Sequence, residues 1–226
     1  MRIEAVLFDM DNTLIDWFAA QESYCSVFAE RHMAFLSRKE RAEAAAQIME
    51  WMGDGNVIPL DTWFAMVLKQ WPIAATQRTL EEERIDLFPS FTVPMPGMME
   101  TLAVLKKRYR LGLLTNGGPA TQRKKVAAAG IESFFDCIVV SGETPWHKPD
   151  PRIFHDILGR MGVRPEHAVY VGDHVQNDVH GALGVGMRPI RLRLAGHPYA
   201  SVEGVPEVDA LGELADILSQ MEEKEG

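Results

Sequence analysis

Two aspartates spaced two residues apart directly follow an apolar segment near the N-terminus. They are Asp9 and Asp11, and the segment before them runs from Ile3 to Phe8. A carboxylate in this position can act as a covalent nucleophile, forming an acyl phosphate with a phosphate ester. A second carboxylate two residues later can point to the same side of an extended chain. It is then placed to protonate a leaving group and afterwards to activate water.

Three further polar clusters follow short apolar runs along the chain. They are Thr115 with Asn116, Lys148 within His147–Asp150, and Asp173 with Asp178. Close carboxylates cannot all stay ionised in a dry site without a compensating cation, and oxygen ligands favour a hard ion such as Mg²⁺. The lysine adds a second positive charge, and hydroxyl, amide and backbone N–H groups add neutral donors. Together these groups predict a site for a phosphate group.

The elements that must position these groups are short, buried strands. Apolar runs typical of strands buried on both faces occur at Ile3–Phe8, Leu111–Leu114, Ile138–Val140 and Ala168–Val171, with a weaker candidate at Pro189–Leu194. Helices are predicted between them, over Gly97–Tyr109, Pro119–Ala129 and a segment that begins at Asp150–Pro151 and stops at Gly162. This alternation predicts an α/β fold with a parallel sheet, whose carboxyl edge is where ligands bind.

Residues 16–94 do not follow this alternation of strands and helices. They show no convincing strand; Arg38–Met52 is alanine-rich and helical, and Leu60–Trp71 has one broad apolar helical face. Four of the five tryptophans lie in this stretch, which gives it enough apolar mass for a small core of its own. We therefore expect a catalytic core formed by residues 1–15 and 95–226, and an all-helical insert formed by residues 16–94.

Composition narrows the function classes. The chain of 226 residues has a formal net charge of −9, which argues against nucleic-acid binding and against a polybasic membrane-surface role. No apolar run is long enough to span a membrane. The two cysteines, Cys25 and Cys137, lie far apart in no metal-ligand spacing, so we expect no disulfide framework and a cytoplasmic location. Either a monomer or a homodimer is compatible with the sequence.

The ordered set of motifs resembles a known superfamily. Asp9–Thr13, Thr115–Gly117, Lys148–Asp150 and Gly172–Asp178 are similar, in order, to the four motifs of the haloacid dehalogenase-like hydrolases. The resemblance implies a Rossmann-like core with a helical cap inserted between the first and second motifs. Residues 16–94 lie where that cap belongs.

The resemblance also implies a role for each motif residue. Asp9 would be the nucleophile and Asp11 the general acid and base. Asp9, the backbone carbonyl of Asp11, and Asp173 would hold Mg²⁺. Thr115 and Lys148 would bind the transferring phosphoryl group with the Asn116 amide as a further donor, and Asp178 would support Lys148 or a metal-bound water.

The motifs also discriminate among subfamilies. Haloacid dehalogenases and phosphonoacetaldehyde hydrolases lack the second aspartate, so Asp11 speaks against both activities. The segment Thr115–Lys125 looks most similar to nucleotidase-type and N-acylneuraminate-9-phosphate phosphatase members. We therefore expect a Mg²⁺-dependent phosphatase that hydrolyses a small soluble phosphomonoester, such as a nucleoside monophosphate or a sugar phosphate, through an aspartyl-phosphate. A phosphomutase of the same fold and a non-catalytic phosphate-binding regulator are the alternatives.

Some neighbouring residues depart from the usual family pattern. Trp146, His147 and His174 are bulkier than the residues usual at these positions, and each could narrow the pocket or contact the substrate. The run Arg123–Lys125 is consecutive and basic, which predicts a solvated helical face.

Overall fold

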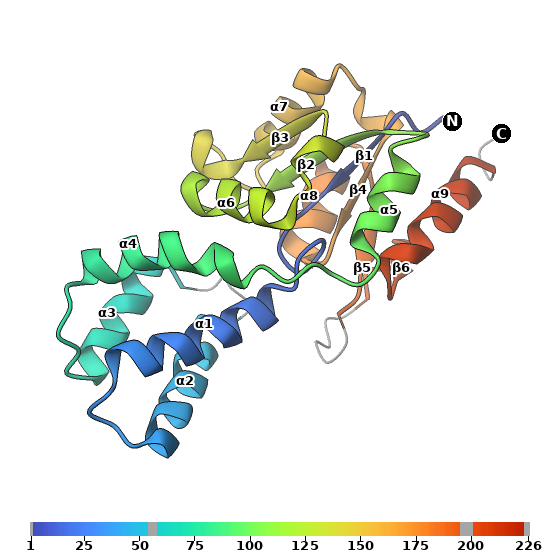
Figure 1. Cartoon of the computed structure of the whole chain (residues 1–226). Coiled ribbons are helices and arrows are strands. Elements are labelled where there is room, and N and C mark those ends of the chain that lie inside the picture. Colours follow the sequence, from blue (N-terminus) through green and yellow to red (C-terminus); the bar gives the residue numbers. More distant parts are fainter. Residues whose placement is uncertain (1, 54–57, 195–200, 224–226) are drawn as a thin grey trace. The chain divides into compact units, whose positions relative to one another are not determined.

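The computed structural model describes residues 2–53, 58–194 and 201–223, and the chain divides into two compact units (Figure 1). One unit comprises Met1–Asp16 together with Pro94–Gly226, and the other comprises Trp17–Val93. Among the described residues, all strands belong to the first unit, whereas the regular elements of the second are helices.

A six-stranded sheet forms the centre of the first unit. Its strands are β1 (Ala5–Phe8), β2 (Arg110–Thr115), β3 (Cys137–Val140), β4 (Ala168–Gly172), β5 (Arg188–Leu192) and β6 (Glu207–Val208). The order is β3-β2-β1-β4-β5-β6 and every neighbouring pair is parallel, which confirms the predicted sheet. Because β1 lies between β2 and β4, where the strand order reverses, its carboxyl end is at the ligand-binding position of such sheets.

Helices cover both faces of this sheet. On one face lie α5 (Met98–Leu105), α6 (Pro119–Ala129) and α9 (Leu214–Glu223); on the other lie α7 (Pro151–Met161) and α8 (Gly181–Gly184). Figure 1 shows α5 and α9 next to each other on their face. Alternate residues of β1 point to opposite faces of the sheet. Val6 and Phe8 pack into the core beneath α5, α6 and α9, whereas Ala5 and Leu7 pack into the core beneath α7 and α8. A strand that is apolar on both sides is therefore required here.

The helix ends follow the local sequence. The Asp150 side chain caps α7 by accepting from the backbone N–H of Arg152, and Pro151 occupies the first turn. Gly130 and Gly162 end α6 and α7 in the left-handed conformation, at φ 67° and 62°. Single turns of 3-10 or π helix complete the described core at Glu132–Phe134, Ser141–Glu143, Pro165–His167, Val175–His180 and Leu211–Glu213.

The second unit has its own core. It comprises α1 (Trp17–His32), α2 (Arg38–Met52), α3 (Leu60–Gln70), α4 (Gln77–Leu87) and a 3-10 turn at Phe88–Phe91. Trp63 is completely buried at its centre beside Tyr24 and Phe28, and its indole N–H donates to the backbone oxygen of Ile48 at 3.0 Å. The apolar stripe of α3 thus packs inward, as its helical spacing predicts.

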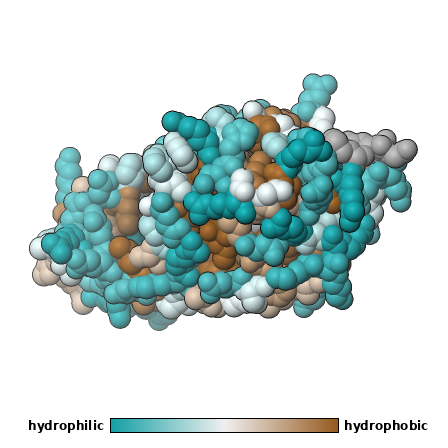
Figure 2. Space-filling view, turned by 90° about the horizontal axis from the view of Figure 1, so that it is seen from above, coloured by the Kyte–Doolittle hydropathy of each residue, from teal (hydrophilic) through white to brown (hydrophobic). Residues whose placement is uncertain are grey.

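In the described part of the chain, no helix has the length and apolar character needed to cross a bilayer. On the face seen in Figure 2, hydrophilic residues predominate, and hydrophobic residues are visible in smaller areas between them.

Candidate active site

A tight loop after β1 presents the two N-terminal aspartates. The backbone N–H of Asp9 still donates to Val171 of β4 at 2.9 Å, so this residue continues the sheet. The chain then turns back at Asn12, which has φ 59°, and the Asn12 N–H donates to the Ile15 carbonyl at 2.7 Å. Asparagine tolerates this left-handed conformation better than most residues. The turn keeps both Asp9 and Asp11 at the carboxyl end of the sheet.

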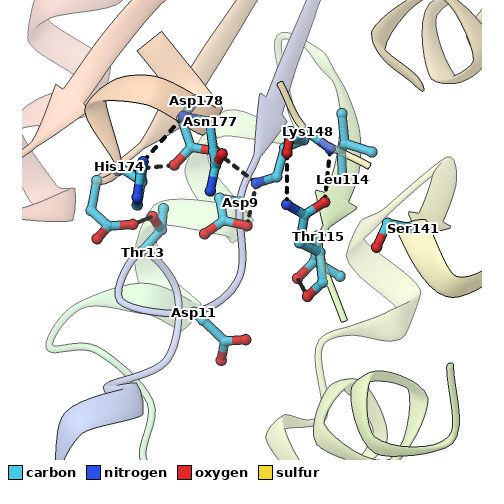
Figure 3. Close-up of polar contacts among 12 residues, drawn as sticks. Asp9, Asp11, Thr13, Leu114, Thr115, Ser141, Lys148, His174, Asn177 and Asp178 are labelled. Carbon is cyan, nitrogen blue, oxygen red and sulfur yellow. Dashed lines mark hydrogen bonds and ion pairs between the residues drawn. The ribbon is translucent and has the colours of Figure 1, made fainter. Parts of the chain in front are cut away.

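Lys148 is the electrostatic centre of the site. It is 3% exposed, and its Nζ donates to Asp9 Oδ1 at 2.6 Å, to Asp178 Oδ1 at 2.7 Å and to the Tyr170 hydroxyl at 2.9 Å. Figure 3 shows the ammonium between the Asp9 and Asp178 carboxylates, with Asp11 pointing away from this group. The Tyr170 hydroxyl in turn donates to the Leu114 carbonyl at 2.9 Å. All three ammonium hydrogens have acceptors, so the lysine is fixed in place.

Burial and neighbouring charges shift the pKa values of Asp9 and Lys148. Burial raises the pKa of Asp9 to about 7, and the charges of Asp178 and Asp11 add to this rise while Lys148 opposes it. Burial alone would lower the pKa of Lys148, but the Asp178 and Asp9 carboxylates hold it well above its ordinary value. The lysine is therefore a permanent positive charge in the site.

Three buried carboxylates converge beside this lysine. One oxygen from each of Asp9, Asp173 and Asp178 lies within 4.8 Å of the others. Burial, reinforced by Asp178 and Asp9, raises the pKa of Asp173 well above its usual range. Three carboxylates against one ammonium leave an excess of negative charge, which a divalent cation with oxygen ligands would neutralise. The donor set therefore fits a hard divalent cation such as Mg²⁺.

The turn after β4 fixes Asp178. The backbone N–H of His174 donates to Asp178 Oδ2 at 3.0 Å. The His174 ring accepts at Nδ1 from the backbone N–H groups of Gln176 and Asn177, at 3.2 and 3.1 Å. The ring thus caps the π-helical turn Val175–His180. In this geometry His174 orders the loop that follows β4, and a direct contact with substrate stays a prediction.

The second motif connects two loops. The side chain of Asn116 binds the backbone of Lys148 on both sides, donating to its carbonyl at 3.0 Å and accepting from its N–H at 2.9 Å. This geometry assigns the amide to holding Lys148, and its donation to a phosphate stays a prediction. Thr115, at the end of β2, is buried.

Two residues before Lys148 lie towards α7. Trp146 is partly buried, with the Arg152 guanidinium 5.5 Å from its ring centroid. His147 is exposed, and its carbonyl accepts from the Asp150 N–H at 2.8 Å. These contacts fix the start of α7, and a role for either side chain towards substrate stays a prediction.

One prediction from the basic run on α6 is wrong. Lys125 is 4% exposed, and its Nζ lies 2.7 Å from Asp11 Oδ2, so it does not lie on a solvated face. Gln122, one helical turn earlier, is also buried and contacts the same carboxylate. The i,i+3 spacing of these two residues was the available signal, because residues at this spacing share a helix face. Lys124 is exposed as expected, and Arg123 pairs with Glu143 at the surface.

Comparisons with known proteins show which family the chain resembles. The family described as haloacid dehalogenase-like hydrolase matches residues 6–192. The chain is 32% identical to N-acylneuraminate-9-phosphatase of Rattus norvegicus, covering 97% of this chain and 98% of the relative. It is 36% identical to glyceraldehyde 3-phosphate phosphatase of Methanopyrus kandleri, with the same coverage.

A solved structure extends the likeness to three dimensions. The chain is similar in structure to YfnB of Bacillus subtilis, a haloacid dehalogenase-like (HAD) hydrolase whose crystal structure was obtained bound to magnesium. The TM-score is 0.78 and the sequence identity is 25%, and the match covers 96% of this chain and 99% of that chain. The family match spans more than half of the chain. The chain belongs to the haloacid dehalogenase-like hydrolase family.

Proposed function

We propose that this hydrolase is a Mg²⁺-dependent phosphatase that acts on small phosphomonoesters through an aspartyl-phosphate at Asp9. The observation that carries the proposal is the buried ammonium of Lys148, held between Asp9 and Asp178 beside Asp173. The proposal takes the Asp9 carboxylate as the nucleophile, and Lys148 beside it as part of the positive charge that a transferring phosphoryl group requires. The names of the curated relatives, which are phosphatases, support the same class of reaction.

In the first half-reaction a carboxylate oxygen of Asp9 attacks phosphorus, and the bond from phosphorus to the leaving oxygen breaks. Asp11 gives its proton to that leaving oxygen, which departs as an alcohol. Lys148 and the hydroxyl of Thr115 stabilise the negative charge on the transferring phosphoryl oxygens.

In the second half-reaction a water molecule attacks phosphorus of the acyl phosphate. Asp11, now a carboxylate, takes a proton from this water. The bond from phosphorus to the Asp9 oxygen breaks, which releases inorganic phosphate and restores the Asp9 carboxylate. Lys148 then pairs with Asp9 again, as the structure shows.

The cation has a defined set of candidate ligands. Asp9, Asp173 and the backbone carbonyl of Asp11 would hold it, with Asp178 next to them. When bound, Mg²⁺ supplies positive charge that offsets the repulsion between the carboxylates and the incoming phosphate.

Phosphorylated carbohydrates are the first substrate class that we propose. The two relatives are named for a 9-phosphorylated N-acylneuraminate and for glyceraldehyde 3-phosphate, and each shares nearly its whole length with this chain. Nucleoside monophosphates are the second class. A phosphomutase would return the phosphoryl group to a sugar, so product analysis with a hexose 1-phosphate separates it from a phosphatase.

We also propose that the helical unit Trp17–Val93 acts as a cap that sets substrate choice. It is inserted in the chain directly after the loop that carries Asp9 and Asp11, and its core is its own. Replacing it with a short linker should preserve Mg²⁺ binding and leave feeble hydrolysis of an aryl phosphate without preference among metabolites. A folded, capless protein that keeps the full-length substrate ranking would place specificity in the core.

The variant Asp9→Asn tests the covalent mechanism. The amide keeps the size of the side chain but is a poor nucleophile, so we expect native circular dichroism and loss of at least about 10³-fold in kcat, as for other catalytic nucleophiles. Acid-quenched wild-type enzyme should carry radioactivity from a ³²P-labelled substrate, and the variant should not. Turnover close to wild type in Asp9→Asn would refute the mechanism, and binding without turnover in the wild type would favour a regulator.

A further inference from the structure

The carboxylate of Asp11 is held by two buried side chains of α6. Both of its oxygens accept from Lys125 Nζ, and Oδ2 also accepts from Gln122 Nε2 at 2.9 Å. Lys125 Nζ completes the triangle by donating to Gln122 Oε1 at 2.7 Å. The side chain of Asp11 nevertheless remains 26% exposed, whereas that of Lys125 is only 5% exposed. The contacts therefore restrain a carboxylate that solvent can still reach.

The same glutamine also contacts the second motif. Gln122 Nε2 lies 2.8 Å from Thr115 Oγ1 and 2.9 Å from the Asn116 carbonyl oxygen, so its two hydrogens are shared among these acceptors and Asp11 Oδ2. A hydroxyl that accepts a hydrogen bond keeps its own hydrogen for another acceptor. Among the residues that the structure describes, the acceptor for that hydrogen is the Asn116 carbonyl, at a long distance of 3.3 Å. Gln122 thereby leaves the Thr115 hydroxyl ready to donate to a better acceptor, such as a phosphoryl oxygen.

The backbone at Gly117 makes room for this arrangement. A Cβ at Gly117 would lie 3.0 Å from both Cγ and Cδ of Gln122, and the residue has φ +137°. A side chain here would be strained and would press on the glutamine. The loop of the second motif is therefore shaped to let Gln122 lie beneath it.

We propose that Lys125 and Gln122 are positioning residues for Asp11, and that they fix the direction in which its carboxylate exchanges protons with the leaving group and with water. The inference rests on the proposed function, since it takes Asp11 as the acid and base. Proton transfer requires the donor and acceptor atoms within hydrogen-bond reach. A carboxylate without these two partners can rotate, which lowers the fraction of molecules in reactive geometry.

The test compares Lys125→Met with Lys124→Met, its exposed neighbour on the same helix. With an alkyl phosphate, Lys125→Met should lower kcat by about tenfold or more and change KM by less than about threefold, because general acid–base catalysis contributes about 10²–10⁴-fold. With p-nitrophenyl phosphate, whose leaving group needs little protonation, single-turnover phosphorylation of Asp9 should fall by a smaller factor. Lys125→Arg, which can donate to both carboxylate oxygens, should recover part of the alkyl phosphate activity. Lys124→Met should match the wild type.

A double-mutant cycle with Asp11→Asn completes the test. When Asp11 is already removed, Lys125→Met should cause little further loss with the alkyl phosphate, because its effect passes through that carboxylate. An undiminished effect of Lys125→Met in the Asp11→Asn background would overturn the positioning role. So would alkyl phosphate turnover equal to that of Lys124→Met, or equal losses with alkyl and aryl phosphates.

Failure of the proposed function has a different signature. If Asp11→Asn alone turns over the alkyl phosphate like the wild type, the acid role of Asp11 is wrong and the inference falls with it. Circular dichroism and thermal stabilisation by Mg²⁺ report whether Lys125→Met is folded with its Asp9 and Asp173 ligands intact. If it is not, Gln122→Met carries the same comparison of substrates and the same cycle, since it also removes a donor to Asp11.

Discussion

A Cβ atom on Gly172 would lie 2.4 Å from Oδ2 of Asp178 and 2.5 Å from its carboxyl carbon. Strand β4 ends at this glycine, and the missing side chain lets the carboxylate lie directly against the end of the strand. The other oxygen of the same carboxylate accepts from Lys148 Nζ at 2.7 Å. The absence of a side chain at Gly172 therefore determines where Asp178, a hydrogen-bond partner of Lys148, can lie.

Gly172→Ala should displace Asp178 and thereby loosen Lys148. Overpacking at such a position costs about 1–3 kcal/mol, which denaturant unfolding can measure. We expect kcat to fall by about tenfold or more, since misplacement of a charged group by about 1 Å can cost on the order of 10²-fold. Gly184→Ala is the matched control, because a Cβ there meets no atom within 4 Å and lies in α8. An unchanged kcat in folded Gly172→Ala would show that Lys148 does not need Asp178 in this position.

Tyr170→Phe removes one of the three acceptors of Lys148 and a hydroxyl donor to the Leu114 carbonyl. An unsatisfied buried polar group costs about 1–3 kcal/mol, so the free energy of unfolding should fall by that amount. Lys148 keeps its two carboxylate partners, so we expect a severalfold rather than a complete loss of kcat/KM. Tyr109→Phe, which loses a partly buried hydrogen bond to Glu222, controls for the removal of a hydroxyl. A loss as large as that of Asp9→Asn would contradict this division of roles.

The sequence predicted the strands of the core better than its edge. Strands β1 and β4 are buried on both faces, and such strands leave an apolar run that is visible in the sequence. Strand β6 has two residues, Glu207 and Val208, and it exists through its parallel pairing with β5 rather than through a pattern of its own. The predicted helix from Gly97 to Tyr109 ends at Leu105, where the chain continues as turns.

The motif residues could be identified because each motif is a short, continuous stretch of sequence. Their hydrogen-bond partners, in contrast, come from distant segments of the chain. Lys148 was recognised within its motif, but nothing in the sequence places Tyr170 beneath it. Lys125 was misjudged because three consecutive basic residues suggest one solvated face. Successive residues of an α-helix are about 100° apart, since there are 3.6 per turn, so only one of the three points towards Asp11. Consecutive charges on a helix are better interpreted one position at a time.

The last prediction concerns Mg²⁺ and pH. Without the cation, burial and neighbouring charge raise the pKa of Asp9 to about 7, above the usual value of an aspartate in the unfolded chain. An acid whose pKa is raised by folding favours the folded state when it is protonated. That contribution is complete below the unfolded pKa near 4 and is lost as pH rises through about 7. The cation-free protein should therefore lose stability between about pH 4 and pH 7, because Asp9 ionises in the unfolded chain while burial keeps it protonated in the folded one.

Mg²⁺ should reverse this loss most strongly where the carboxylates are ionised. Protons compete with the cation at about pH 5.5, whereas at about pH 8 the ligands are free to bind it. A cation at about 100 times its Kd stabilises by about 2.7 kcal/mol, which raises Tm by roughly 5–10 °C in a protein of this size. We expect this increase at about pH 8 and a clearly smaller one at about pH 5.5. Asp173→Asn should abolish most of the increase at the higher pH, while Asp156→Asn, a partly buried aspartate of α7 that pairs with Arg160, should retain it. A Tm increase that is the same at both pH values, or that survives in Asp173→Asn, would place the cation outside these carboxylates.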